Sequence, residues 1–218
     1  MINLVCLDRD GTINEDDNHY LGSSENWKSQ IKILPGVIEG IKRLNNTSNL
    51  EIFILTNQSG VALKGEKFSK LTLERMYEVN NYNLNILRNN GVFVRGYFAC
   101  PYIDFKYVER AKLEGREVNP DFIKDNPFDL KPNIGMIKKA VNSLGKTWDE
   151  CNIYAMGDRI SDILLGLNSG GTGILVKSQK TKEIEDIGEA KNLKEKGEKV
   201  YIAKDFLDAV DYIIRDSI

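Results

Sequence analysis

The sequence predicts an α/β fold, in which helices cover both faces of a mainly parallel sheet in a three-layer arrangement without a large cap domain. Short apolar runs alternate along the chain with longer segments of helical periodicity. The apolar runs are unbroken, which is typical of strands that are buried on both faces. Several runs also end in polar residues, as expected where a ligand binds outside the carboxyl ends of parallel strands.

The first half of the chain contains three apolar runs that we expect to be strands. Residues 2–7 form the first run, which stops at a polar turn. Pro35 then opens a helical pattern, since proline is well placed near a helix start. Residues 51–55 form the second strand and residues 94–99 the third, and between them a helix over 71–89 ends at an Asn-Gly pair.

The second half repeats this alternation. We expect helices at 134–144, 160–167 and 206–214, and strands at 152–156, 172–176 and 199–203. The chain has 218 residues and no internal repeat, so we expect one domain over residues 1–218.

Two segments lack a clear strand or helix pattern. Residues 101–130 hold three prolines and are expected to be irregular. They are too long for an ordinary connection, whose median is about 4–6 residues. The segment is therefore either a functional lid or a mobile surface insertion. Residues 177–199 are rich in Lys and Glu, and we interpret them as a solvated helix or loop without a chemical role.

The composition is that of a soluble globular protein, with 41% hydrophobic and 28% charged residues. The formal net charge of −2 gives no basic footprint for nucleic acid. Cys6, Cys100 and Cys151 are far apart and odd in number, which favours a reducing compartment over a disulfide framework. We expect no signal peptide, no membrane span and a cytoplasmic location; the oligomeric state is left open.

Polar residues follow three of the predicted strands at their carboxyl ends, and one more precedes a helix. Since these ends meet at one edge of a parallel sheet, the polar side chains should gather in one crevice. They are Asp8 and Asp10 after the first strand, Thr56 and Asn57 after the second, Asp158 after residues 152–156, and Lys131 before the helix at 134–144.

The order of these residues resembles the four motifs of the haloacid dehalogenase (HAD) superfamily. The motifs are Asp8-Arg9-Asp10-Gly11-Thr12, then Thr56, then Lys131 in Lys131-Pro132, then Gly157-Asp158-Arg159-Ile160-Ser161-Asp162. The match spans about residues 2–176. The resemblance implies a Rossmann-like HAD fold and a phosphatase that requires Mg²⁺.

The resemblance also implies a role for each motif residue. Asp8 is the nucleophile that forms an aspartyl phosphate, and Asp10 is the general acid and then the general base. Asp8, the backbone carbonyl of Asp10 and Asp158 supply oxygen ligands for Mg²⁺. Asp162 holds a metal-bound water or orients its neighbours. Lys131 and Mg²⁺ offset the negative charge, and Thr56 adds a hydroxyl donor.

A finer pattern resembles the near-capless branch of the superfamily, which contains heptose-bisphosphate and histidinol-phosphate phosphatases. It includes Leu34-Pro35-Gly36-Val37, Thr56-Asn57-Gln58-Ser59-Gly60-Val61 and Lys131-Pro132-Asn133-Ile134-Gly135-Met136. Only 22 residues separate Thr12 from Pro35, which leaves no space for a cap domain there. The substrate-binding residues that the resemblance implies are Asn57, Gln58, Ser59, Gly60, Arg9 and Gly11.

The sequence departs from that branch in two places. The branch has a zinc loop, of which Cys100 is the one ligand present here, and the single histidine, His19, is remote. A four-ligand nitrogen and sulfur site cannot be assembled, so we expect no zinc. Leu130 also stands where the branch has a basic residue before Lys131, which predicts weak preference for a second, distal phosphate.

We therefore expect Mg²⁺-dependent hydrolysis of a small phosphomonoester, a phosphorylated sugar or related metabolite. One alternative is a polynucleotide 3′-phosphatase, which would need a basic groove built from Lys106, Arg110, Lys112 and Arg116. The other is a non-catalytic HAD-like binding protein. A small phosphorylated molecule is the expected partner, and nucleic acid is not.

Overall fold

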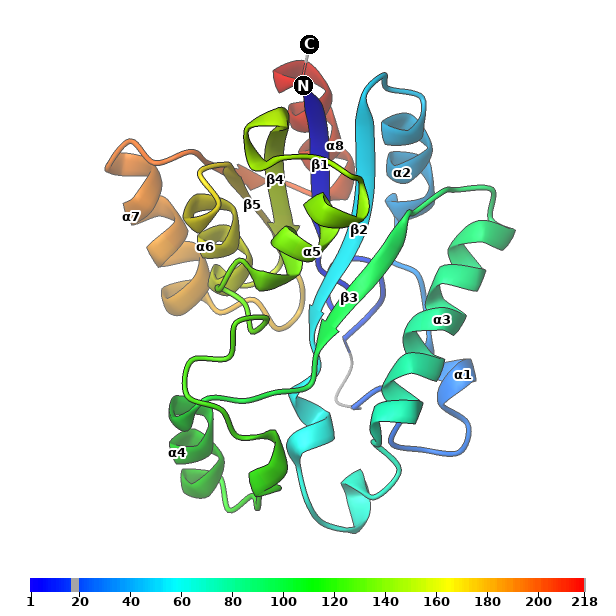
Figure 1. Ribbon diagram of the computed structural model, residues 1–218, viewed down its shortest axis with the longest axis vertical. Coiled ribbons are helices and arrows are strands. Elements are labelled where there is room, and N and C mark those ends of the chain that lie inside the picture. Colours follow the sequence, from blue (N-terminus) through cyan, green and yellow to red (C-terminus); the bar gives the residue numbers. More distant parts are fainter. Residues whose placement is uncertain (17–19, 218) are drawn as a thin grey trace.

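The computed structural model describes residues 1–16 and 20–217, so His19 lies outside the described residues. Its centre is a six-stranded parallel sheet in the order β3-β2-β1-β4-β5-β6 (Figure 1). The strands are β1 (Ile2–Leu7), β2 (Leu50–Asn57), β3 (Gly96–Cys100), β4 (Cys151–Gly157), β5 (Thr172–Val176) and β6 (Val200–Ala203). The predicted parallel α/β fold is confirmed.

The strand order reverses next to β1, and this reversal positions the site. The chain runs from β1 through β2 to β3 on one side and then returns to β4 on the other side of β1. The two connections leave in opposite directions, so a crevice opens at the carboxyl ends of β1 and β4. Residues that follow these two strands are thereby brought together, although about 150 residues of chain separate them.

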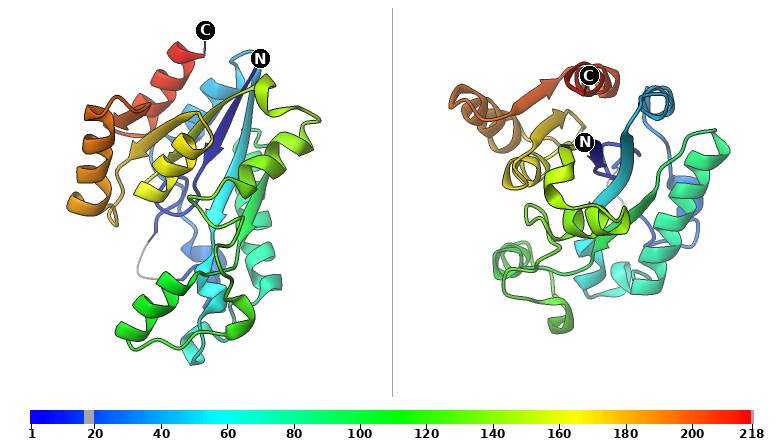
Figure 2. Two further views of the ribbon diagram at one scale, coloured as in Figure 1. Left: turned by 60° about the vertical axis from the view of Figure 1, so that its left-hand side comes forward. Right: turned by 45° about the horizontal axis from the view of Figure 1, so that its top comes forward.

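Helices cover both faces of the sheet, as the two views in Figure 2 show. They are α1 (Trp27–Gln30), α2 (Val37–Asn45), α3 (Leu73–Asn89), α4 (Phe105–Leu113), α5 (Gly135–Ser143), α6 (Ile160–Asn168), α7 (Glu189–Glu195) and α8 (Phe206–Asp216). Buried residues of α2, α3 and α8 form one core layer with β1, β2 and β4, and residues of α5 and α6 form another layer on the sheet.

Local sequence features begin the helices and allow them to pack closely. The hydroxyl of Thr72 accepts a hydrogen bond from the backbone N–H of Arg75 at the start of α3, and Asp205 caps α8 in the same way. Gly40 in α2 lets α8 approach, since a Cβ atom there would lie 2.7 Å from the ring of Phe206. The predicted helices are confirmed, with ends that differ by at most two residues from the predictions.

The prediction that residues 101–130 are irregular is wrong for α4. Asp104 caps this helix by accepting a 2.8 Å hydrogen bond from the N–H of Tyr107. Val108 is buried with Ala62 and Ile103 in a small core cluster, and Ala111 is buried as well. The helix has nine residues, and its packing against residues distant in the sequence is a tertiary effect that local periodicity does not contain. A lid role for this segment remains a prediction.

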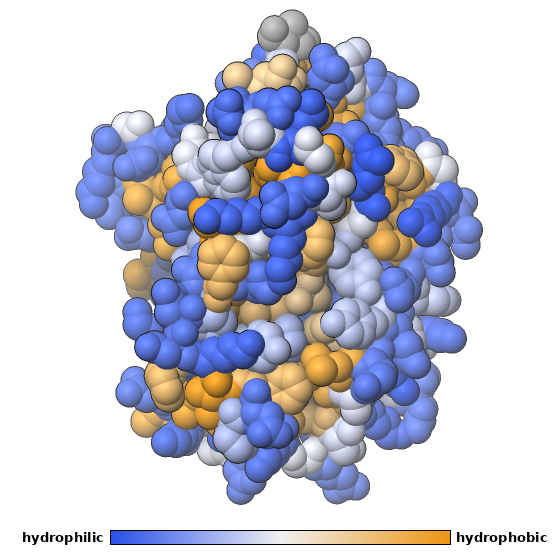
Figure 3. Space-filling model, in the orientation of Figure 1, coloured by the Kyte–Doolittle hydropathy of each residue, from blue (hydrophilic) through white to orange (hydrophobic). Residues whose placement is uncertain are grey.

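The segment 177–199 contains a helical turn, Glu183–Gly188, followed by α7. Ile187 and Ala190 are buried against α6 in a third core cluster. On the face shown in Figure 3, hydrophilic residues cover most of the surface and hydrophobic residues lie in smaller groups. Within the described part of the chain, none of the helices combines the length and apolar character that a membrane span needs.

Candidate active site

A cavity of about 840 Å³ opens at the carboxyl ends of β1, β2 and β4. Its floor is formed by the residues that follow these strands, among them Asp8, Thr56 and Asp158. Residues of α4 and of the 180–186 segment form its rim. The predicted gathering of strand-end residues in one crevice agrees with this cavity, and the segment 101–130 contributes to its wall.

Three carboxylates and one ammonium group meet at the floor of this cavity. Lys131 Nζ lies 2.6 Å from Oδ1 of Asp8 and 2.6 Å from Oδ1 of Asp162. Carboxylate oxygens of Asp8, Asp158 and Asp162 lie within 4.8 Å of one another. All four residues are buried, with Asp8 the most exposed at 8%.

The cluster carries more negative than positive charge. Burial raises the pKa of Asp8 well above its usual range, and Asp162 and Asp158 add to this while Lys131 opposes it. Burial followed by the charge of Asp162 raises the pKa of Asp158 to about 7. Burial alone would lower the pKa of Lys131, but Asp162 and Asp8 raise it, so the lysine keeps its proton. Three hard oxygen donors with this charge excess fit a divalent cation such as Mg²⁺.

Asp158 is held in place by residues that the sequence did not indicate. Ser178 Oγ donates a 2.5 Å hydrogen bond to Oδ2 of Asp158, and Thr181 Oγ1 donates to its backbone carbonyl at 2.9 Å. The pattern of polar residues after strands could have identified Ser178, because it closely follows the end of β5. Gly11, at φ +83°, leaves room for this carboxylate, since a Cβ atom there would lie 2.5 Å from Oδ2 of Asp158.

The segment 177–199 also fixes the start of α6. Asp186 is 1% exposed and accepts hydrogen bonds from the backbone N–H of Ile160 at 2.8 Å and from Arg159 Nε at 3.1 Å. Asp162 accepts from the backbone N–H of Arg159 at 3.2 Å, so one carboxylate serves both Lys131 and the helix end. The segment 177–199 therefore supports residues of the candidate site, which the interpretation as a solvated helix or loop did not anticipate.

Asp10 accepts hydrogen bonds at both carboxylate oxygens. Oδ1 accepts from Arg9 Nε at 2.9 Å and from Asn14 Nδ2 at 3.1 Å, and Oδ2 accepts from Arg9 Nη2 at 2.6 Å and from Gln58 Nε2 at 2.9 Å. Burial by itself would raise the pKa of Asp10, but the charge of Arg9 and these hydrogen bonds lower it. The side chain is 25% exposed and lines the cavity.

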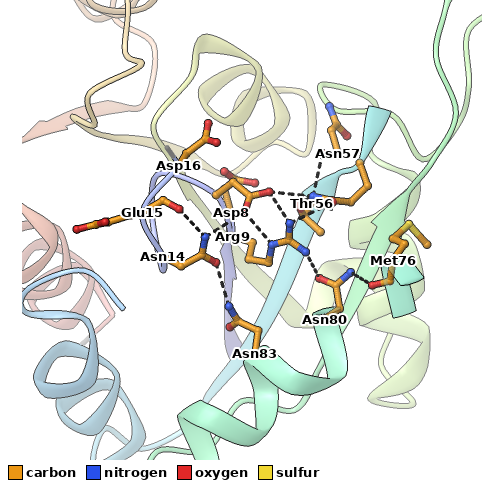
Figure 4. Close-up of polar contacts among 12 residues, drawn as sticks. Asp8, Arg9, Asn14, Glu15, Asp16, Thr56, Asn57, Met76, Asn80 and Asn83 are labelled. Atoms are coloured by element: carbon orange, nitrogen blue, oxygen red, sulfur yellow. Dashed lines mark hydrogen bonds and ion pairs between the residues drawn. The ribbon is translucent and has the colours of Figure 1, made fainter. Parts of the chain in front are cut away.

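The residues after β2 line the cavity in two different ways. The Asn57 side chain pairs with the backbone of Lys131, accepting from its N–H at 3.0 Å and donating to its carbonyl at 3.3 Å. Gln58 donates to Thr56 Oγ1 at 2.8 Å as well as to Asp10. Figure 4 shows Thr56 and Asn57 projecting from β2. Asn57 thus ties the strand-end turn to Lys131.

The remaining predicted substrate-binding residues lie in or beside the turns that line the cavity. Ser59 and Gly60 begin a short 3-10 helix, Ser59–Ala62, and both line the cavity. The N–H of Gly11 donates to the carbonyl of Asn14 at 2.8 Å. This hydrogen bond places Gly11 in a turn.

Cys100 and Leu130 occupy the two places where the sequence departs from the branch described above. Cys100 is fully buried, and burial raises the pKa of its thiol to about 11. Its Sγ lies 3.8 Å from the carbonyl of Tyr102, to which it donates a weak hydrogen bond. Leu130 packs on the core layer beneath α5 and also lines the cavity.

The chain is similar to a family model and to several known proteins. Residues 130–209 match the HAD-hydrolase-like family model. The D-glycero-beta-D-manno-heptose-1,7-bisphosphate 7-phosphatase of Mesorhizobium japonicum is 31% identical over 166 residues, which is 76% of this chain and 65% of that protein. The D-glycero-alpha-D-manno-heptose-1,7-bisphosphate 7-phosphatase of Campylobacter jejuni is 32% identical over 192 residues, covering 88% of this chain and 91% of that protein.

A solved structure shares the fold. The D,D-heptose 1,7-bisphosphate phosphatase of B. bronchiseptica, crystallised with magnesium and phosphate, superposes with a TM-score of 0.67. The match covers 99% of each chain at 21% sequence identity. The relatives and the family model show that the chain belongs to the HAD superfamily, in the branch of phosphatases that contains the heptose-1,7-bisphosphate 7-phosphatases.

Proposed function

We propose that this chain is a Mg²⁺-dependent phosphomonoesterase that hydrolyses a phosphorylated sugar through an aspartyl phosphate on Asp8. The observation that carries the proposal is the buried cluster in which Lys131 bridges Asp8 and Asp162 beside Asp158. A carboxylate is a nucleophile only when it is ionised. Burial and like charges oppose ionisation of Asp8, and a cation at this cluster would restore it.

The chain's own groups account for both half-reactions. The negative charge of a bound phosphate would offset the effect of Arg9 and favour the protonated form of Asp10. An oxygen of Asp8 attacks phosphorus, a bond from Asp8 to phosphorus forms, and the bond to the leaving oxygen breaks while Asp10 gives that oxygen a proton. Water then attacks the same phosphorus, its proton passes to Asp10, and the bond to Asp8 breaks. Lys131 and the Thr56 hydroxyl offset the charge of the phosphoryl oxygens.

We propose that the buried cluster of Asp8, Asp158 and Asp162 is the Mg²⁺ site. Asp8, Asp158 and the backbone carbonyl of Asp10 would hold Mg²⁺, and Asp162 would hold a metal-bound water or orient Lys131. When bound, Mg²⁺ supplies positive charge next to the transferring phosphoryl group. We propose no zinc: Cys100 is the one zinc-loop ligand in the sequence, whereas a structural zinc site takes four nitrogen or sulfur ligands.

The relatives' names favour a sugar phosphate over a polynucleotide end. The rim residues Lys106, Arg110 and Arg116 lie among acidic neighbours, Asp104 and Glu114, on the same rim. A mixed rim suits a small anionic molecule better than a nucleic-acid backbone, which favours a continuous basic surface. We propose that α4 and its flanking loops act as a partial lid on this substrate.

The test is phosphate release from a panel of sugar monophosphates and bisphosphates, with and without excess chelator. We expect activity that is abolished by the chelator, restored by Mg²⁺, and absent in Asp8→Asn, whose amide is nearly isosteric but cannot act as the nucleophile. Full activity of the wild-type protein in excess chelator would show that the reaction does not require Mg²⁺. Activity only on oligonucleotide 3′-phosphates would favour a polynucleotide 3′-phosphatase.

A further inference from the structure

The guanidinium of Arg9 lies inside the wall of the cavity, where this residue is only 1% exposed. Its Nε and Nη2 atoms bind the two carboxylate oxygens of Asp10 as a bidentate pair, at 2.9 and 2.6 Å. Nη1 donates to Asn80 Oδ1 at 2.8 Å, and Nη2 also donates to Gln58 Oε1 at 3.0 Å. A guanidinium carries five N–H donors and no acceptor, so these contacts use most of its capacity and leave little for a substrate.

Two asparagines on α3, Asn80 and Asn83, form hydrogen bonds with Arg9 and Asn14 (Figure 4). Asn80 Nδ2 donates to the carbonyl of Met76 at 2.8 Å, which turns the amide oxygen toward Arg9. Asn83 Nδ2 donates to Asn14 Oδ1 at 2.9 Å, and Asn14 in turn donates to Asp10. Both series of hydrogen bonds lead from α3 to the carboxylate of Asp10.

Without such a role, asparagines at these two positions would only lower the stability of the fold. Asn80 and Asn83 are 2% and 0% exposed. Asparagine is a poor residue for a helix interior, and a buried amide destabilises the fold unless it is hydrogen-bonded. An apolar residue at either position would suit both the helix and the core. The amides therefore point to a requirement at the groups that they hold, Arg9 and Asn14.

We propose that Arg9 is a positioning residue: anchored by Asn80, it holds the carboxyl group of Asp10 at the place from which Asp10 serves the leaving oxygen. The inference rests on the proposed function, because it requires Asp10 to be the proton donor. Asp10 projects from a turn and is 25% exposed. Without the clamp, only one hydrogen bond each from Asn14 and Gln58 would hold its carboxyl group in this rotamer. A displacement of about 1 Å in a catalytic group is enough to cost about 10²-fold in rate.

This role differs measurably from substrate binding by Arg9. A lost substrate contact raises KM or lowers kcat/KM for all substrates alike. A misplaced proton donor instead slows the substrates whose leaving oxygen needs a proton. The alkoxide of an alkyl phosphate needs that proton to leave, whereas the dinitrophenolate of dinitrophenyl phosphate leaves as a stable anion without it. The ratio of the two kcat/KM values, which include only the steps up to the departure of the leaving oxygen, therefore reports the position of Asp10.

The experiment compares Arg9→Met and Asn80→Leu with the wild-type protein on these two substrates in saturating Mg²⁺. We expect kcat/KM for the alkyl phosphate to fall by about 10- to 100-fold, and kcat/KM for dinitrophenyl phosphate to fall by no more than a few-fold. Asn80→Leu keeps Arg9 and places a better helix former in α3, so it provides the answer if Arg9→Met does not fold.

The matched control is Arg95→Met, which breaks an ion pair with Glu51 outside the cavity and should leave the ratio unchanged. Asp10→Asn serves as the reference. If Asp10→Asn shows no selective loss on the alkyl phosphate, the proposed role of Asp10 fails. If Asp10→Asn shows it but Arg9→Met and Asn80→Leu lower kcat/KM equally for both substrates, the positioning role is overturned. Adding Arg9→Met to Asp10→Asn should cause no further selective loss.

Discussion

The ammonium group of Lys131 lies 2.6 Å from Oδ1 of Asp8, although 123 positions separate the two residues in the sequence. The contact joins the end of β1 to the turn before α5, inside a site where both side chains are less than 10% exposed. Asn57 holds the backbone of Lys131 from the end of β2. The lysine is therefore fixed from two strands, and it is the cation nearest to the proposed nucleophile.

Removal of the Lys131 charge should damage both stability and turnover. In Lys131→Met, Asp8 and Asp162 lose their buried partner, and breaking such a pair costs about 3–5 kcal/mol. We expect a lower free energy of unfolding that Mg²⁺ partly restores, together with a severe loss of kcat. Denaturant unfolding with and without Mg²⁺ measures the first effect. Lys139→Met, which breaks an exposed ion pair with Asp129, is the control, and equal stability of the two variants would contradict this account.

Removal of the Ser178 hydroxyl should weaken Mg²⁺ binding. Ser178→Ala leaves Oδ2 of Asp158 without its 2.5 Å hydrogen bond, and loss of a group that orients a metal ligand typically costs about 10- to 100-fold in metal affinity or activity. Titration of activity and of the unfolding temperature with MgCl₂ measures the change. Ser143→Ala, which removes a hydroxyl bonded within α5, should behave as wild type. Unaltered Mg²⁺ affinity in Ser178→Ala would rule out this support.

The pKa of Asp158 predicts how pH and Mg²⁺ act together. Burial and the charge of Asp162 raise this pKa to about 7 in the metal-free protein. A carboxyl group whose pKa is raised on folding stabilises the folded state fully at pH values below its pKa in the unfolded chain, which is about 3.9. That stability is lost as the pH rises through about 7. Mg²⁺ binds the ionised form and should offset this loss.

We therefore expect MgCl₂ to raise the unfolding temperature more at about pH 8 than at about pH 6. Asp158→Asn removes the titrating group, so it should raise the unfolding temperature of the metal-free protein at the higher pH and reduce the effect of Mg²⁺. Thermal unfolding followed by circular dichroism at both pH values provides the measurement. An equal response to Mg²⁺ at the two pH values would mean that Asp158 does not titrate in this range.

Leu130 offers a test of substrate preference. It lines the cavity without charge, directly before Lys131. A charge-assisted hydrogen bond to phosphate contributes about 1.5–3 kcal/mol, so Leu130→Arg should raise kcat/KM for sugar bisphosphates by about tenfold or more relative to monophosphates. Leu144→Arg, at a partly buried position of the same core layer that does not line the cavity, is the control. A strong wild-type preference for bisphosphates would show that Lys106 or Arg110 already supplies this charge.

The sequence predicted the sheet and the strand-end residues because both depend on local patterns. Unbroken apolar runs such as Ile2–Leu7 identify buried strands, and the polar residues that follow them identify the crevice. α4 was missed because its burial depends on Ile103 and on the loop after β2. The contacts of Arg9 with Asn80 and of Ser178 with Asp158 join residues that only the folded chain brings together. No periodicity in the sequence encodes these pairs.

The most direct test of the central claim is the detection of a phosphorylated Asp8. Turnover of a ³²P-labelled sugar phosphate, quenched in acid, should leave label on the N-terminal peptide that contains Asp8, and hydroxylamine should remove it as it does an acyl phosphate. The label and the turnover should both be absent in a folded Asp8→Asn variant. Label on another residue, or turnover by Asp8→Asn comparable to that of the wild-type protein, would contradict the assignment of Asp8 as the nucleophile.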